Sequence, residues 1–262
     1  MFDQLRKRFG KGTRKKHEIN AETADLTPPV HIGIIMDGNG RWAARRNLSR
    51  SVGHRYGGET LRKIVYAASD LGVSYITVYA FSTENWKRPQ KEIDAIMDLF
   101  FDFFDRYRGE LKNIDCRVRF SGRTEGLPPK VVETIRTAER ESAHCRGIQL
   151  IVAFNYGGRQ EILDALKKLN ASRLQAGIPA DEPVSEEEFS RFLYLPDVPD
   201  PDLIIRSSGE MRLSNFLLWE AAYAEFWVSD ILWPDFTKED LMQAISDYNA
   251  RDRRYGGLSN GK

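Results

Sequence analysis

Short apolar segments that alternate with longer amphipathic ones constrain the fold of this chain more than any other feature. Apolar segments of strand length lie at 31–36, 75–80, 116–121, 149–154, 203–206 and 226–228. Helices are expected between and after them, at roughly 55–71, 91–111, 129–143, 159–175, 185–193 and 238–252. Strands that alternate with helices form a mostly parallel sheet covered on both faces. The sequence therefore predicts a single α/β domain with a six-stranded, mostly parallel β-sheet flanked by helices.

Length and composition agree with one such domain and argue against several other classes of protein. The 262 residues, 41% of them hydrophobic, suffice for a substantial core. A formal net charge of +1 argues against a general binder of nucleic acid, so any basic site must be local. No run approaches the ~18 apolar residues of a membrane-spanning helix. The two cysteines form neither a metal-spaced pair nor a disulfide framework, so a cytoplasmic protein is expected.

The first 30 residues differ from the rest of the chain. Between Leu5 and Lys16 the sequence has seven Lys or Arg residues and no acid. A flexible, solvated tail and a weak peripheral anchor to anionic lipid both fit this pattern, because each basic residue near such a surface contributes ~1 kcal/mol. Pro28 and Pro29 then mark a boundary between a basic extension (1–30) and a folded domain (31–262).

Polar, glycine-rich loops follow several of the predicted strands. Because the carboxyl ends of parallel strands meet at one edge of a sheet, where ligands collect, these loops are expected to share a cleft. They read DGNGRW (37–42), FSTENWKRP (81–89), NYGGR (155–159) and RSSGEMRLSN (206–215). Arginine beside glycine, serine or asparagine suits phosphate, because guanidinium and backbone N–H groups match phosphate oxygens. One such loop is equally consistent with a simple turn, but several together indicate a phosphate-binding cleft.

Further residues near the first loop refine this hypothesis. Asp37 places a carboxylate among the phosphate-binding groups, which suggests that a metal ion shares the site. Arg50 and His54 are added as candidates because Gly53 keeps the backbone near them uncrowded, although a solvated helix face fits these residues equally. The spacings of a P-loop and of a dinucleotide-binding motif are both absent, so no nucleotide cofactor is indicated.

The helix expected from Ile93 to Phe104 is apolar around most of its circumference. Such a helix is usually simply buried. Beside a phosphate-binding rim, however, it also suits a substrate with a charged head and a hydrocarbon tail. This second interpretation predicts an apolar tunnel and a lipid phosphate as substrate.

Taken together, these segments resemble the cis-prenyltransferase family, and within it most closely the bacterial undecaprenyl diphosphate synthases. The matching segments are HIGIIMDGNGRWA (31–43), GH (53–54), YAFSTENWKRP (79–89), NYGGR (155–159), DLIIRSSGEMRLSNFLLWEAAYAE (202–225), LWPDF (232–236) and RRYGG (253–257). They cover nearly the whole chain in the order typical of the family, which makes the set far more specific than any one motif.

The resemblance implies a homodimeric, Mg²⁺-dependent transferase, cytoplasmic or peripheral at the inner face of the membrane. It implies condensation of isopentenyl diphosphate with an allylic diphosphate, such as farnesyl diphosphate, into a Z-polyprenyl diphosphate. Undecaprenyl diphosphate, the precursor of the carrier lipid of cell-wall synthesis, is the expected product. No nucleic-acid partner is expected.

The resemblance also assigns roles to individual residues. Asp37 and Asn85 are expected to be catalytic, and Asp37 is expected to bind the metal together with Glu225, which would reach the site of the neighbouring subunit. The expected ligands of the allylic diphosphate are Gly38, Asn39, Gly40, Arg41, Trp42, Arg50, His54, Ser82, Thr83, Glu84, Trp86 and Arg88. Those of isopentenyl diphosphate are Arg206, Arg212, Ser214, Arg254 and Gly256. The proton acceptor stays open among Asp37, a Ser82–Asn85 relay and the diphosphate itself.

Two alternatives remain at this point. A short-chain synthase is one, because Phe154 is bulkier than the small residue expected at its position; it either shortens the tunnel or faces another helix. A non-catalytic subunit of a heteromeric enzyme is the other, although such subunits lack the acid of the first loop. A two-metal phosphoester enzyme is disfavoured, since the four histidines are scattered along the chain.

Overall fold

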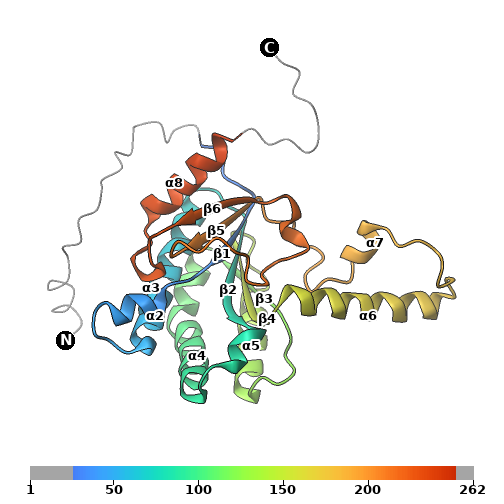
Figure 1. The fold of residues 1–262 in the computed structure, drawn as a ribbon, viewed down its shortest axis with the longest axis horizontal. Coiled ribbons are helices and arrows are strands. Elements are labelled where there is room, and N and C mark those ends of the chain that lie inside the picture. Colours follow the sequence, from blue (N-terminus) through green and yellow to red (C-terminus); the bar gives the residue numbers. More distant parts are fainter. Residues whose placement is uncertain (1–25, 252–262) are drawn as a thin grey trace, which may run out of the picture.

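Six strands form one sheet in which every neighbouring pair is parallel (Figure 1). The structure is a computed structural model, and it describes residues 26–251. The order of the strands across the sheet is β3-β4-β2-β1-β5-β6. Their bounds are β1 His31–Ile35, β2 Tyr75–Ser82, β3 Arg117–Ser121, β4 Gln149–Tyr156, β5 Leu203–Ser207 and β6 Glu225–Ser229. The predicted six-stranded parallel sheet is confirmed.

Helices connect and cover the strands as expected. The α-helices are α2 Asn39–Ala44, α3 Arg50–Asp70, α4 Gln90–Asn113, α5 Pro129–Ser142, α6 Gly158–Ala176, α7 Glu186–Ser190 and α8 Lys238–Asn249. Three short 3₁₀ helices are η2 Thr83–Lys87, η3 Glu220–Tyr223 and η4 Trp233–Asp235. The sequence did not predict α2, and α3 begins at Arg50 rather than at residue 55. Both differences lie between residues 39 and 55, a segment rich in arginine in which no apolar helical periodicity stands out.

The two faces of the sheet are covered differently. Side chains at alternate strand positions, such as Ile32, Ile34 and Val78, pack into the main core with helices α3, α4, α5 and α8. The opposite face has a smaller core, in which Ile204 and Tyr156 meet Phe216 of the segment after β5. Of the four helices on the first face, α3 and α4 line a pocket beside the sheet.

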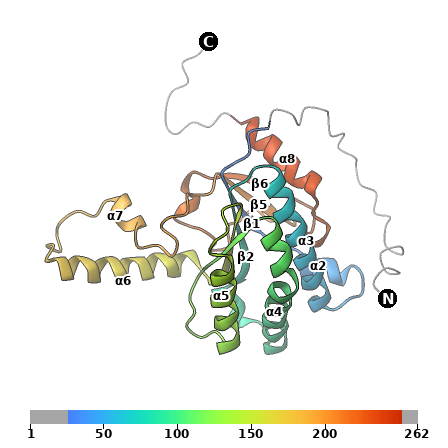
Figure 2. The same ribbon diagram turned by 180° about the vertical axis from the view of Figure 1, so that it is seen from behind.

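Helix α6 projects from the body of the molecule, with α7 folded back beside it (Figures 1 and 2). A small cluster that includes Leu169 and Phe189 joins the two helices, and Arg173 of α6 donates a hydrogen bond to Glu188 of α7 at 2.7 Å. On the outside of α6, Leu166 and Leu174 are exposed. The projection therefore exposes apolar side chains on which no other described part of the chain packs.

The segment 26–30 belongs to the body of the domain. The backbone N–H and carbonyl of Thr27 bond with the side chain of Asn249 on α8, and the Val30 N–H donates to Asp202. From the sequence, we expected residues 26–30 to be the last part of the basic extension (1–30). The rest of the extension, including the basic stretch from Leu5 to Lys16, lies outside the described residues.

Both cysteines, Cys116 and Cys145, are buried and free. Among residues 26–251, no helix has the length and apolar character needed to cross a bilayer.

His31, at the start of β1, makes stability depend on pH. It is 2% exposed, and its Nδ1 lies 2.6 Å from the carbonyl oxygen of Pro199, which can only accept. Nδ1 therefore donates, and in the neutral ring Nε2 accepts from the Thr77 hydroxyl at 2.7 Å. Burial lowers the pKa of His31 to about 4, although the Pro199 bond and the charge of Asp202 oppose this.

Because the unfolded chain protonates this histidine near its ordinary pKa of 6.5, stability should fall as pH drops from 6.5 toward 4. The contribution of His31 over this range is about 3 kcal/mol. Urea unfolding at pH 7 and pH 4.5 measures it: the loss of stability should be smaller in His31→Gln than in the wild type. His144→Gln, at an exposed position, is the matched control and should keep the wild-type loss. Equal losses in all three proteins would contradict the assignment.

Candidate active site

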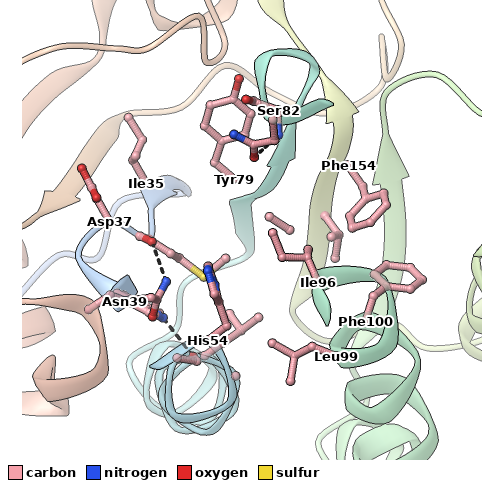
Figure 3. A pocket seen from close by; sticks show the side chains of 18 of the residues that line it. Ile35, Asp37, Asn39, His54, Tyr79, Ser82, Ile96, Leu99, Phe100 and Phe154 are labelled. Carbon is pink, nitrogen blue, oxygen red and sulfur yellow. Dashed lines mark hydrogen bonds between the residues drawn. The ribbon is translucent and has the colours of Figure 1, made fainter. Parts of the chain in front are cut away.

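A pocket of about 730 Å³ opens at the carboxyl edge of the sheet, between the strands and helices α3 and α4. Asp37 and Asn39 lie on one side of it, and Phe100 and Phe154 lie on the opposite side (Figure 3). The pocket thus combines a polar, charged wall with an aromatic one. Three of the four polar loops, those after β1, β2 and β5, contribute side chains to it, as expected from their positions at strand ends.

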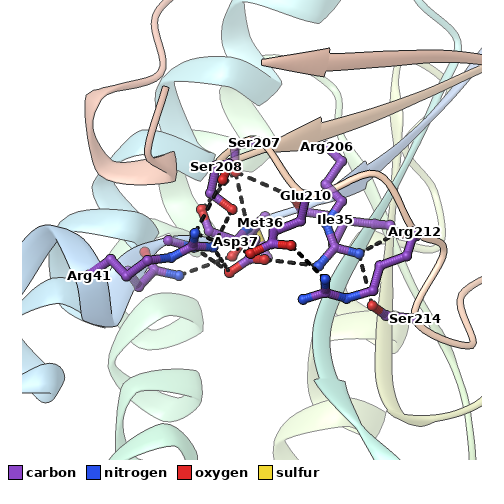
Figure 4. Close-up of polar contacts among 12 residues, drawn as sticks. Ile35, Met36, Asp37, Arg41, Arg206, Ser207, Ser208, Glu210, Arg212 and Ser214 are labelled. Carbon is purple, nitrogen blue, oxygen red and sulfur yellow. Dashed lines mark hydrogen bonds and ion pairs between the residues drawn. The ribbon is translucent and has the colours of Figure 1, made fainter. Parts of the chain in front are cut away.

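Asp37, directly after β1, is held between two arginines (Figure 4). Its Oδ2 accepts a hydrogen bond from Arg206 at 2.9 Å, and its Oδ1 lies 3.2 Å from Nη2 of Arg41. The backbone N–H of Gly38 also donates to Oδ1, at 2.6 Å. Burial opposes ionisation, but the bond from Arg206 and the charges of Arg206 and Arg41 outweigh it and lower the pKa of Asp37. Asp37 is therefore an ionised carboxylate at neutral pH.

Arg206 is a buried cation at the end of β5, only 4% exposed. It donates to the Ser214 hydroxyl at 2.8 Å and to the carbonyl of Arg212, as well as to Asp37. Its Nε is buried and has no hydrogen-bond partner in the described part of the protein. A buried guanidinium that keeps an unused donor beside a pocket is a suitable partner for an anion.

The loop after β5 extends this charged cluster. Arg41 donates to the Ser208 hydroxyl at 2.6 Å, and Glu210 lies between Arg41 at 3.4 Å and Arg212 at 2.5 Å. With Asp37 and Arg206, the cluster has three arginines and two carboxylates, which leaves it positive. A positive cluster with an unused guanidinium N–H favours binding of phosphate groups.

Close packing of α3 on the first loop explains two of its glycines. A Cβ on Gly53 would lie 2.2 Å from the carbonyl oxygen of Asn39, and one on Gly57 would lie 2.3 Å from Oδ1 of Asn39. Any side chain at either position would push α3 away from the loop. The two glycines, one turn apart, therefore set the position of Asn39 at the pocket wall.

His54 also lies on α3 and lines the pocket. Burial, together with the nearby positive charge of Arg88, lowers its pKa to about 4, although Glu92 opposes this. The ring is therefore neutral at pH 7 in the absence of ligand. A neutral imidazole can donate one hydrogen bond and accept another.

Helix η2 begins with its own capping interactions. The Asn85 side chain accepts the backbone N–H of Ser82 at 3.0 Å. Glu84 accepts a hydrogen bond from Asn215 of the loop after β5 at 2.9 Å. The loops after β2 and β5 are thereby joined at the pocket.

The family model described as "Putative undecaprenyl diphosphate synthase" matches residues 35–256. The chain belongs to this prenyltransferase family. An isoprenyl transferase from Clostridium acetobutylicum is 49% identical over 260 residues, which cover 98% of this chain and all of the relative. One from Thermotoga maritima is 52% identical over 233 residues, 89% of this chain and 99% of the relative. The protein is accordingly a prenyl-transferring enzyme.

A solved structure supports the same conclusion. Lavandulyl diphosphate synthase from Lavandula x intermedia, in complex with dimethylallyl diphosphate, superposes with a TM-score of 0.82 at 34% identity. The match covers 88% of this chain and 99% of that one.

Half of the residues predicted for the site of this prenyltransferase line the pocket: Asp37, Asn39, His54, Ser82, Glu84, Asn85, Arg88, Arg206, Arg212 and Ser214. Gly38, Gly40, Arg41, Trp42, Arg50, Thr83, Trp86 and Glu225 do not line it. Arg254 and Gly256 lie outside the described residues. Residues of both predicted diphosphate sites therefore line one pocket, whereas seven residues predicted for the allylic site do not line it.

Trp42 and Arg50 are two of the predicted residues that do not line the pocket. Trp42 is buried, with its indole N–H donating to Asp235 at 2.8 Å and the guanidinium of Arg46 over its ring. Arg50 lies at the rim and pairs with Glu92 at 2.8 Å. Trp42 therefore holds α2 in place in this structure.

Glu225 lies at the other edge of the sheet from Asp37. It is level with Leu203 of β5, which is level with Ile32 of β1. At ~3.3 Å per residue, Glu225 is thus about 16 Å from Asp37 along the strands. Its carboxylate pairs with Arg251 at 2.5 Å. One chain does not bring the two acids together.

The donor set fits Mg²⁺ through one protein ligand. Asp37 supplies an ionised carboxylate oxygen, and Mg²⁺ in proteins commonly takes one or two carboxylates together with substrate phosphates and water. Within residues 26–251, no group of three or more His, Cys, Asp and Glu side chains is placed to hold a metal by itself. A metal here would therefore depend on the substrate for further ligands.

The site residues assigned from the sequence did not include Tyr79 or Asn155, although Asn155 begins the polar loop NYGGR (155–159). Tyr79 lines the pocket and its hydroxyl donates to the carbonyls of Ser214, at 3.3 Å, and Tyr156, at 3.4 Å. Asn155, buried at φ 50°, accepts from the indole N–H of Trp86 at 2.7 Å and donates to two carbonyls of the loop after β3. A polar residue at a strand end pointed to Asn155, whereas nothing in the strand pattern distinguished Tyr79.

Proposed function

We propose that this prenyltransferase condenses isopentenyl diphosphate with an allylic diphosphate, starting from farnesyl diphosphate, and forms a Z-polyprenyl diphosphate. One observation carries the proposal. The same pocket has a charged wall with buried Arg206 and ionised Asp37 and, opposite it, an aromatic wall with Phe100 and Phe154. A charged head and a hydrocarbon tail each find a matching wall there. The dimethylallyl diphosphate in the similar Lavandula structure supports an allylic diphosphate as substrate.

The allylic diphosphate is proposed to lie between the first loop and α3. Asn39 and the neutral His54 line this part of the pocket, and Arg88 reaches it from the end of η2. Arg50 and Arg88 both bond to Glu92 and so stand together at the rim. An anion that binds here would pair with Arg50 and Arg88, which the carboxylate of Glu92 holds in place.

Isopentenyl diphosphate is proposed to occupy the cluster around Arg206. Arg212 and Ser214 line the pocket beside it, and the unused Nε of Arg206 adds a donor. The predicted contributions of Arg254 and Gly256 concern residues that the structure does not describe. The two diphosphates are therefore proposed to bind at separate sites, one with Arg50 and Arg88 and the other with Arg206 and Arg212.

The reaction breaks the allylic C–O bond and forms a carbon–carbon bond to the double bond of isopentenyl diphosphate, which then loses a proton. Arg41 and Arg88 are proposed to stand beside the departing allylic diphosphate, where negative charge develops, and fixed donors at such a place stabilise the transition state. Mg²⁺, when bound at Asp37, would add Lewis-acid stabilisation of the same charge. The lowered pKa of Asp37 makes it a weak base, which favours the diphosphate as proton acceptor.

Undecaprenyl diphosphate, for the carrier lipid of the cell wall, is the proposed product, with the apolar wall continuing as a tunnel for the growing chain. A short-chain product is the second candidate, because Phe154 stacks with Phe81 and packs on Phe100 at the inner wall. Both positions considered for Phe154 are realised: it lines the pocket and it contacts α4. A non-catalytic subunit is disfavoured, since Asp37 and Arg206 occupy one pocket.

Phe154→Leu should lengthen the product. Leucine at this buried position is smaller than phenylalanine and still apolar, so the length distribution should shift toward longer products. Mass spectrometry of the products at saturating isopentenyl diphosphate measures the change. Phe189→Leu, a buried aromatic between α6 and α7, is the matched control. An unchanged length distribution in Phe154→Leu would exclude this ring as a limit on chain length.

A homodimer is proposed as the working form. Exposed apolar residues on and near the projecting α6, including Leu163, Leu174 and Tyr223, suit a second copy. A second copy would also allow Glu225 to approach a site other than its own, as the resemblance implies. A cytoplasmic location, with membrane contact through the basic extension and the lipid product, completes the proposal.

One assay tests the proposed function. Purified protein is incubated with labelled isopentenyl diphosphate, farnesyl diphosphate and Mg²⁺, with and without a chelator, and the products are separated by chain length. Labelled polyprenyl diphosphates that disappear with chelator are expected. Absence of products with either farnesyl or dimethylallyl diphosphate as starter would refute the proposal.

A further inference from the structure

Asn215, in the loop after β5, connects three segments at the wall of the active-site pocket. Its side-chain Oδ1 accepts the backbone N–H of Arg159 at 2.9 Å, and its carbonyl accepts that of Gly158 at 2.7 Å, both in the first turn of α6. Its Nδ2 donates to Oε1 of Glu84 in helix η2 at 2.9 Å. Asn215 itself lines the pocket, directly after Ser214. One amide therefore joins α6, η2 and the loop after β5.

The orientation of this amide follows from its partners. A backbone N–H can only donate and an ionised carboxylate can only accept, so Oδ1 faces Arg159 and Nδ2 faces Glu84. Burial opposes ionisation of Glu84, but its hydrogen bonds, including the one from Asn215, lower its pKa. The Thr83 hydroxyl donates to the other carboxylate oxygen, Oε2, at 3.2 Å. The two oxygens of Glu84 thus have separate donors, and Asn215 is one of them.

The backbone at this point is constrained as well. Ser214 and Asn215 are both left-handed, with φ of 52° and 66°, a conformation that such residues keep only where neighbouring bonds hold it. The Tyr79 hydroxyl donates to the carbonyl of Ser214 at 3.3 Å, and the Gly158 N–H donates to that of Asn215. The turn presents the Ser214 hydroxyl to Arg206 at 2.8 Å (Figure 4). Asn215 therefore helps to place a group of the predicted isopentenyl diphosphate site.

Gly157, just before α6, lets η2 and Asn215 pack against the same stretch of backbone. A Cβ on Gly157 would lie 2.6 Å from the hydroxyl oxygen of Thr83 and 2.7 Å from Nδ2 of Asn215. This stretch follows β4, which is paired with a strand on each side. The loop after β5 and helix η2 thus share one base at the end of an interior strand.

We propose that Asn215 is a positioning residue whose amide fixes the loop after β5 and helix η2 relative to each other, and with them the two bound diphosphates. This inference rests on the proposed function, which places isopentenyl diphosphate at Arg206 and Ser214 and the allylic diphosphate beside η2. Formation of the carbon–carbon bond requires the two substrates at near-attack distance. Each diphosphate has its own cations, so the distance between the substrates depends on what joins the two sites.

Exchanging donor and acceptor tests this bridge. Asn215→Asp keeps an acceptor for Arg159 and suits a left-handed backbone, but it places a carboxylate against that of Glu84. Adding Glu84→Gln restores the bond in the opposite direction, because the glutamine amide donates while its oxygen still accepts from Thr83. This double variant, the swap variant, has the net charge of the wild type. The comparison needs four proteins: the wild type, each single variant and the swap variant.

The expected result is a loss of kcat that depends on residue 84. In the wild-type background, Asn215→Asp should lower kcat about tenfold to a hundredfold and change both KM values less than about threefold, because each diphosphate keeps its cations. In the Glu84→Gln background the same substitution should lower kcat less than about threefold. Steady-state kinetics with each substrate varied in turn measure both. Equal losses of kcat in the two backgrounds would overturn the proposal.

The swap variant keeps the test decisive even if Asn215→Asp alone does not fold. Its Tm should equal that of Glu84→Gln, because the bond to residue 84 is restored. A swap variant with that Tm but a kcat more than about tenfold lower than that of Glu84→Gln would contradict the proposed role.

The pH profile of Asn215→Asp provides a readout that a purely structural role would not move. Two adjacent carboxylates raise the pKa of one of them, and once that one is protonated its O–H donates to the other and the bridge forms again. The kcat of the variant relative to the wild type should therefore rise as pH falls from about 8 to about 6. Burial and the charge of Glu84 raise the pKa of Tyr79, so this neighbouring hydroxyl stays protonated throughout. A constant ratio would count against the bridge.

Asn249→Asp is the matched control. Asn249 also accepts a backbone N–H and donates to a carbonyl, both of Thr27, but it does not line the pocket. Its substitution should leave kcat at the wild-type value even where it lowers the Tm. A loss of kcat as large as that of Asn215→Asp would show a general effect of losing an amide donor and would refute the specific role.

Hydrogen exchange separates this inference from the proposed function, because it needs no turnover. The backbone amides of η2 should exchange about tenfold faster in Asn215→Asp and return to the wild-type rate in the swap variant. Unchanged exchange at η2 in Asn215→Asp would overturn the bridge. Absence of turnover in the wild type would refute the proposed function instead, and the exchange rates would still decide whether Asn215 holds η2.

Discussion

Asp37→Asn should lower kcat/KM for condensation about a thousandfold, or by about 4 kcal/mol of transition-state free energy. The amide keeps the shape of the side chain but removes the charge that would hold Mg²⁺ and that now pairs with Arg206 and Arg41. Initial rates with labelled isopentenyl diphosphate measure the loss. Asparagine keeps an oxygen that can accept from Arg206 but leaves this buried guanidinium without its counter-ion, so the Tm should fall as well, and the rates are compared at a temperature at which both proteins are folded.

Glu210→Gln is the matched control for this experiment. Glu210 is also a carboxylate that pairs with Arg41, but its side chain is 35% exposed and it does not line the pocket. Exposed ion pairs contribute about 0–1 kcal/mol, so the rate should change less than about fivefold. Comparable losses in the two variants would indicate a general charge effect and would contradict a specific role for Asp37.

Arg206→Lys should raise the KM for isopentenyl diphosphate by about tenfold to a hundredfold and leave the KM for the allylic substrate nearly unchanged. Lysine keeps the charge but cannot replace the planar fork, which bonds Asp37, Ser214 and the Arg212 carbonyl simultaneously. Lysine is preferred to alanine because removing the cation would leave Asp37 unpaired, a change that costs about 3–5 kcal/mol when the pair is buried. Steady-state kinetics with each substrate varied in turn provide the measurement.

Arg88→Lys supplies the reverse comparison, since Arg88 lines the other side of the pocket near His54. Its larger effect should be on the KM of the allylic diphosphate. Arg46→Lys, at a guanidinium that stacks on Trp42 outside the pocket, should change neither constant. Equal effects of Arg206→Lys on both substrates would contradict separate diphosphate sites.

Much of this architecture is readable from the sequence because its signals are local. Each strand is a short apolar run, and a parallel sheet necessarily gathers the loops at their carboxyl ends. Asp37 and Arg206, 169 positions apart, were therefore expected near each other, and the structure joins them at 2.9 Å.

Other features depend on packing between distant segments and leave no local signal. The six-residue α2 is too short for its periodicity to show. Trp42 belongs to a loop of phosphate-binding composition, yet its ring is buried against Tyr56 and Leu232, and only the folded chain decides between these two environments. Tyr79 looks like an ordinary strand residue, and its role follows from the segment after β5 that folds over it.

The pair formed by Asp37 and Arg206 has a consequence for how ligands enter. Arg41 and Arg206 would repel each other across an empty site, and the carboxylate between them acts as a resident counter-ion that keeps both guanidinium groups in position. Arrival of a diphosphate is then an exchange of one anion for another. The arginines need not be ordered at the moment of binding, so the entropic cost of assembling the site has already been met during folding.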